Sequence, residues 1–86
     1  MGFLKDNVIP GDHGKVFGTD AKKDEDLEYI KSEILKIKGI KDVVIDRSIF
    51  PIELTVYTSA LVKVDDVEKV VQKTGFHAIP QELFSL

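Results

Sequence analysis

The chain has 86 residues, which is enough for one domain with a modest hydrophobic core. A net charge of −3 and a pI near 5.3, with lysines and acids interspersed, argue against a nucleic-acid partner, because such a partner usually requires a basic stripe. No apolar run reaches the length needed for membrane insertion. The N-terminus becomes charged at Lys5 and shows no signal-peptide pattern, so we expect a cytoplasmic protein.

The first part of the chain is expected to be irregular. Residues 1–14 read as an N-terminal extension, since Pro10-Gly11 is a turn dipeptide. Residues 15–19 predict a short first strand, and a polar, acidic loop follows over residues 20–26. The folded domain is therefore expected to begin at residue 15.

A helix is predicted to start within that acidic loop. The carboxylate of Asp24 is expected to cap it by accepting hydrogen bonds from the first free backbone N–H groups. Gly39 is expected to end the helix in the left-handed conformation. The apolar residues recur at spacings of three and four, which places them on one face: Leu27, Ile30, Ile34 and Ile37.

The next segment predicts two strands. Val43 and Ile45 share one face of the first strand. In the second strand, over residues 52–57, apolar side chains alternate with Glu53, Thr55 and Tyr57. This alternation indicates a sheet with one buried and one open face, and Tyr57 is expected on the open face.

The last third of the domain predicts a second helix and a final strand. Asp65 is expected to cap the helix, with Glu68 completing a capping box, and Gly75 to end it. A strand follows over residues 76–79, and residues 81–86 form an apolar C-terminal tail. The order strand, helix, strand, strand, helix, strand predicts an α+β, ferredoxin-like fold over residues 15–80. It has a four-stranded antiparallel sheet and two helices on one face.

Three segments resemble the heavy-metal-associated (HMA) domain family: Gly39–Asp46, Ile52–Tyr57 and Val67–Phe76. The family carries copper and related ions on two cysteines, and Lys23 and Asp26 stand at those two positions. The resemblance implies a domain of a metal-binding and transport family. Because the chain has no cysteine, binding of copper(I) by thiolates is excluded, as is any disulfide framework.

The main functional hypothesis is a non-catalytic binding or interaction module without a cofactor. No nucleophile motif or phosphate-cradling loop supports an enzyme. We expect a protein partner or self-association, through the open sheet face with Tyr57 or through an edge. By the resemblance, that edge carries Lys23, Lys73 and Phe76. The apolar ends of the chain either cover the sheet or form an exposed patch, and the sequence leaves both interpretations open.

Two alternatives use other chemistry. A direct metal-ion carrier would bind zinc, nickel or cobalt through His77 with the nearby carboxylates of Asp20, Asp24 and Asp26. The competing interpretation is a strand histidine beside acids that complement a helix dipole. A small-ligand regulatory domain is the other alternative, and it follows from fold analogy alone.

Overall fold

The computed structural model describes residues 8–81. Most of the predicted apolar ends, with Phe3 and Leu4 at one end and Leu83, Phe84 and Leu86 at the other, therefore lie outside the described residues. The elements in chain order are β1 (Val8–Ile9), β2 (Gly14–Thr19), α1 (Asp24–Leu35), β3 (Ile40–Asp46), β4 (Ile52–Thr58), β5 (Val62–Lys63), α2 (Val64–Lys73) and β6 (Ala78–Pro80). Within this series, β2, α1, β3, β4, α2 and β6 have the predicted order, which confirms the ferredoxin-like fold.

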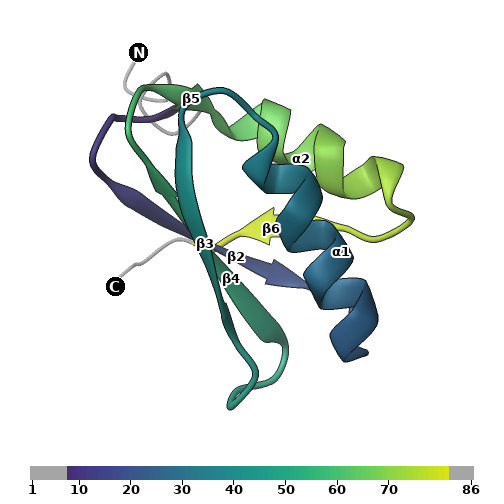
Figure 1. Cartoon of the computed structure of the whole chain (residues 1–86). Helices are drawn as coiled ribbons and strands as arrows, with labels where there is room; N and C mark the ends of the chain where they lie inside the picture. Colours follow the sequence, from purple (N-terminus) through teal and green to yellow (C-terminus); the bar gives the residue numbers. More distant parts are fainter. Residues whose placement is uncertain (1–7, 82–86) are drawn as a thin grey trace.

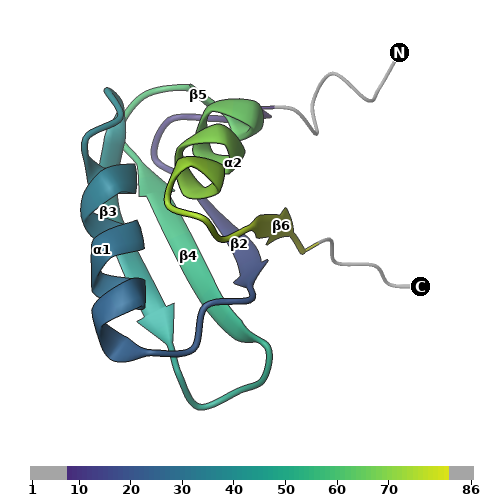
Figure 2. The same ribbon diagram turned by 90° about the vertical axis from the view of Figure 1, so that its right-hand side faces the viewer.

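The main sheet has four strands in the spatial order β3-β4-β2-β6, and every neighbouring pair is antiparallel. Both helices cover the same face of this sheet, as Figure 1 shows edge-on and Figure 2 shows from the helical side. In the described part of the chain no helix covers the other face, which we call the open face.

The hydrophobic core lies between the sheet and the helices. Phe17 in β2 and Leu54 and Val56 in β4 are fully buried, as period-two alternation requires of one face of a strand. The helices contribute the buried residues of their predicted apolar faces, Leu27, Ile30 and Ile34 from α1 and Val64, Val67 and Val71 from α2.

The helix starts differ from the prediction. The N-caps are Lys23 and Lys63, and neither makes a side-chain capping hydrogen bond. The predicted caps at Asp24 and Asp65 are therefore wrong, because both residues already lie in the first helical turn. In that turn their negative charges still interact favourably with the positive end of the helix dipole. Both glycines have the positive φ of the left-handed region, +98° at Gly39 and +96° at Gly75. Gly75 follows the C-cap of α2, as predicted, but α1 already ends at Leu35, so the prediction that Gly39 ends this helix is wrong and Ile37 lies beyond it.

Residues 8–14, predicted as part of an extension, pack against the domain. β1 pairs antiparallel with β5, and Ile9 is only 2 % exposed and belongs to the core. The hydroxyl of the buried Thr58 donates a hydrogen bond of 2.6 Å to the backbone oxygen of Pro10. The packed structure therefore begins before residue 15, because two short strands that are distant in the sequence meet in space.

Candidate functional site

The open face carries the second set of alternating side chains. Strand pairing and alternation place four kinds of residue there: acids (Asp42, Asp46, Glu53), apolar or aromatic residues (Val16, Val44, Tyr57, Ile79), Thr55, and two glycines (Gly14, Gly18). Tyr57 is exposed, in agreement with its predicted position, and Ile79 is 62 % exposed.

A depression of about 440 Å³ lies at one end of this face. It forms where the end of β2, the β3–β4 loop and β6 meet. Phe50, at the rim, is 77 % exposed, more than any other large hydrophobic residue described. The lining residues are Gly18, Thr19, Asp20, Lys22, Phe50, Pro51, His77, Ile79 and Gln81.

Two local contacts shape the depression. A Cβ atom at Gly18 would lie 2.6 Å from Nε2 of Gln81, so the absence of a side chain at this position lets Gln81 reach across β2. On the other side, Nζ of Lys22 lies 5.5 Å from the centroid of the Phe50 ring, a distance that permits a cation–π interaction. The exposed aromatic ring is therefore held beside a positive charge.

Asp20 and His77 join the two loops at this end of the sheet. The backbone N–H of His77 donates a hydrogen bond of 2.8 Å to Oδ1 of Asp20, and the ring Nδ1 lies 3.4 Å from Oδ2. The backbone hydrogen bond is the main reason that the pKa of Asp20 is lowered, because it favours the ionised carboxylate. Two of the predicted metal-site residues therefore touch.

The predicted four-residue metal site is not assembled. Among residues 8–81, no group of three or more histidine, cysteine, aspartate or glutamate side chains could hold a metal ion. Asp24 instead contacts Arg47, and Asp26 lies in the first turn of α1. The cause is geometric: the acids of α1 project from a helix, whereas Asp20 lies before it at the end of β2.

The residues of the predicted interaction edge divide between surface and core. Lys23 is the exposed N-cap of α1, and Lys73 is the exposed last residue of α2. Phe76 is half-buried and packs against the hydrophobic core, so its ring has a structural role at this edge. A glycine followed by an aromatic residue does not show by itself which way the ring points.

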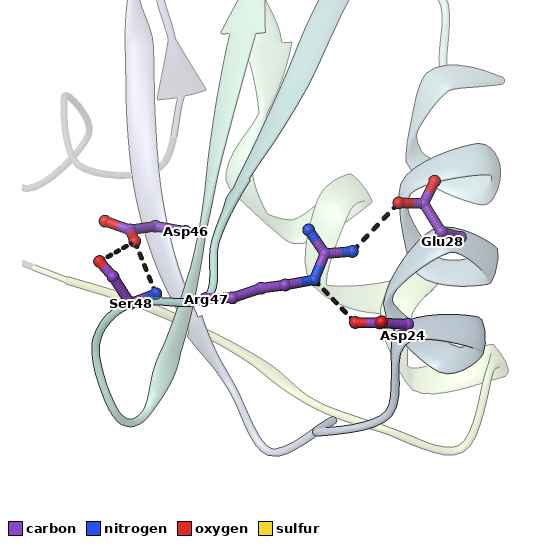
Figure 3. A network of polar contacts seen from close by, with 5 residues as sticks. All are labelled: Asp24, Glu28, Asp46, Arg47 and Ser48. Atoms are coloured by element: carbon purple, nitrogen blue, oxygen red, sulfur yellow. Dashed lines mark hydrogen bonds and ion pairs between the residues drawn. The ribbon is translucent and has the colours of Figure 1, made fainter.

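Arg47 links the β3–β4 loop to α1, as Figure 3 shows. Its Nε lies 2.9 Å from Oδ1 of Asp24, and Nη2 lies 3.2 Å from Oε2 of Glu28. These hydrogen bonds raise the pKa of Arg47. The neighbouring carboxylate of Asp46 accepts hydrogen bonds from the Ser48 hydroxyl and backbone N–H, at 2.6 and 3.0 Å, which lower its pKa.

Sequence reasoning missed Arg47, Ser48 and Phe50. Arg47 contacts residues that are 23 and 19 positions away in the sequence, and no local pattern predicts these contacts. The only available signal was Ile49-Phe50-Pro51, an apolar segment in a loop between two strands. An apolar loop of this kind indicates an interaction surface only if it stays exposed, and exposure is a tertiary property.

Comparisons with known proteins support the fold. No protein-family model and no curated protein matches the chain. Among solved structures, the chain is similar to the apo form of the HMA domain of a copper chaperone for superoxide dismutase. The TM-score is 0.66 at 15 % identity, over 84 % of this chain and 69 % of that one. No helix within residues 8–81 is long and apolar enough to cross a membrane. The chain thus has the fold of an HMA domain, built without a single cysteine.

Proposed function

We propose that this protein is a non-catalytic interaction module that binds a partner protein at the depression between Phe50 and Ile79. The carrying observation is the exposure of these two side chains, 77 % and 62 %, on either side of a concave, helix-free surface. Large apolar side chains grouped at a concave site favour binding, since their burial releases water from both surfaces.

The shape of the site suits an inserted side chain. Pro51 and Ile79 offer apolar contacts, while Lys22 and Asp20 supply a positive and a negative group that would fix orientation. Aromatic residues anchor many protein interfaces, and the Phe50 ring lies beside Lys22. We therefore expect Phe50 to contribute the largest share of the binding free energy.

The similarity to a copper-chaperone domain suggests a setting for this role. The neighbour is named as part of a protein that serves superoxide dismutase, so a domain of this fold works within a metal-delivery protein. The present chain lacks thiolates, and we propose that it keeps the scaffold and uses it for contact with a protein, in the cytoplasm, without a cofactor.

Site-specific photocrosslinking tests the proposal. A photoreactive phenylalanine analogue at position 50 is expected to trap a defined partner in cells that make the protein. The same analogue at Tyr29, an exposed position on α1, is the matched control. The trapped protein is then purified and its affinity measured, and Phe50→Ser should weaken binding about tenfold or more. Equal crosslinking at both positions, or unchanged affinity in the variant, would reject the docking site.

The contact between Asp20 and His77 favours a second candidate, a direct carrier of zinc, nickel or cobalt. Two protein groups would bind the ion, with its remaining ligands from water or a second molecule. Titration with each ion should shift the amide signals of these residues. Replacement by His77→Ala should abolish the shifts. Unchanged affinity in that variant would eliminate this site.

A further inference from the structure

The depression continues into a row of side chains that crosses the sheet. Gly18 pairs with Glu53 of β4 on one side and with Ile79 of β6 on the other, and Glu53 pairs with Asp46 of β3. All four lie on the open face by strand alternation. The row therefore runs from an apolar end at Ile79, over a glycine, to two adjacent carboxylates.

The two carboxylates have no cation partner among the ion pairs of the described residues. Arg47, next to Asp46 in the chain, is drawn to the helix side by Asp24 and Glu28. Like charges directly opposite each other on neighbouring strands are unfavourable. The hydrogen bonds from Ser48 also keep the Asp46 carboxylate fixed and ionised. This end of the row is therefore a negative surface that is open to an external cation.

The surface between the apolar end and the acidic end of the row is also hollowed. A second depression, of about 410 Å³, is lined by Gly14, Lys15, Val16, Glu53 and Gln81. Glu53 therefore borders a hollow, and Gln81 lines both hollows and separates them. A partner segment that lies across Gln81, whose side chain covers the buried Gly18, would reach the apolar end and the acidic end at the same time.

On the basis of the proposed docking function, we infer that the partner presents an apolar side chain and a lysine or arginine about 10 Å apart. The separation follows from two strand spacings of about 4.8 Å each, from Ile79 across Gly18 to Glu53. The apolar side chain enters the depression beside Phe50 and Pro51. The cation lies over Glu53 and Asp46, where charge complementarity selects a basic segment.

A second copy of this chain fits the surface less well. Two copies in face-to-face contact would bring the acidic pairs of both chains into one interface, with no counter-charge on the row itself. The open face therefore discriminates in favour of a partner of opposite charge. Sedimentation of the purified full chain is expected to show a monomer, and a dimer that Glu53→Gln strengthens would overturn the inference.

Selection from a random twelve-residue peptide library displayed on phage tests the partner chemistry directly. Selected peptides are expected to carry lysine or arginine near an apolar residue. Their affinity for the full chain should fall about tenfold in Glu53→Gln and with added salt. Glu68→Gln on α2 makes the same chemical change on the helical side and should leave affinity unchanged.

The outcomes separate the inference from the docking function. Neutral or acidic peptides that still require Phe50 would overturn the basic partner but leave the docking site in place. Basic peptides that bind Phe50→Ser as well as the wild type would overturn both. Equal loss of affinity in Glu53→Gln and Glu68→Gln would show a general charge effect and would also overturn the inference.

Discussion

The two faces of the sheet are built from the same strands and have opposite properties. On the helical face, Phe17, Leu54 and Val56 are fully buried in a continuous core. The residues next to them in the sequence face the open side. Among them, Gly18 has no side chain, Glu53 is charged and lines a hollow, and Tyr57 presents an exposed ring. Stability and the proposed binding therefore depend on alternate residues of one strand, and substitutions at neighbouring positions should separate the two properties.

The largest difference is expected between Phe17 and Val16 in β2. Phe17→Ala should lower the free energy of unfolding by about 3–5 kcal/mol, because it removes a fully buried ring and leaves a cavity. Val16→Ala on the open face should cost about 1 kcal/mol or less. Urea denaturation measures both values, and equal losses would contradict the division between the faces.

A smaller contrast is expected between two threonines of β4. Thr58→Val should lower the free energy of unfolding by about 1–3 kcal/mol. The buried Thr58 hydroxyl donates a hydrogen bond to the backbone oxygen of Pro10, and valine cannot replace this donor. Thr55→Val on the open face should be close to neutral, because valine suits a strand and no hydrogen bond is lost. Thermal unfolding of both variants is the measurement. A neutral Thr58→Val would mean that this hydrogen bond to Pro10 contributes little to stability.

The contact between Asp20 and His77, just beyond the end of β2, should make the stability of the protein depend on pH. Because the pKa of Asp20 is lowered in the folded protein, its stabilisation is present above the unfolded value of about 3.9 and is lost as the pH falls through the lower folded value. Asp20→Asn should therefore be less stable than the wild type at pH 7, and the two curves should converge below about pH 4. Parallel curves down to pH 2 would contradict this assignment.

The smallest effect on stability is expected from Arg47, which connects the β3–β4 loop to α1. Arg47→Ala removes two exposed ion pairs, so the loss of stability should be slight and should disappear in high salt. The informative measurement is the amide spectrum of residues 48–51. A change at Phe50 would show that Arg47 helps to position the loop, whereas an unchanged loop would restrict its role to α1.

Local sequence patterns determined most of the fold. The spacing of Leu27, Ile30 and Ile34 predicts the buried face of α1, the alternation in β4 separates Leu54 from Tyr57, and Gly39 marks a left-handed turn. These features depend on the helical and strand periods, so a few consecutive residues are enough to reveal them. The absence of cysteine likewise excludes thiolate copper chemistry, because that chemistry needs a sulfur ligand whatever fold the chain adopts.

Only the tertiary structure decided which distant groups meet. It brought Ile9 into the core through β5, directed Asp24 to Arg47 instead of His77 and left Phe50 exposed beside Lys22. Each contact joins segments whose approach depends on how the sheet and helices pack, and the residues themselves carry no period that would indicate it. The row from Ile79 to Asp46 depends in the same way on the register in which the strands pair. The sequence of one strand does not show which residues of the next strand lie beside it.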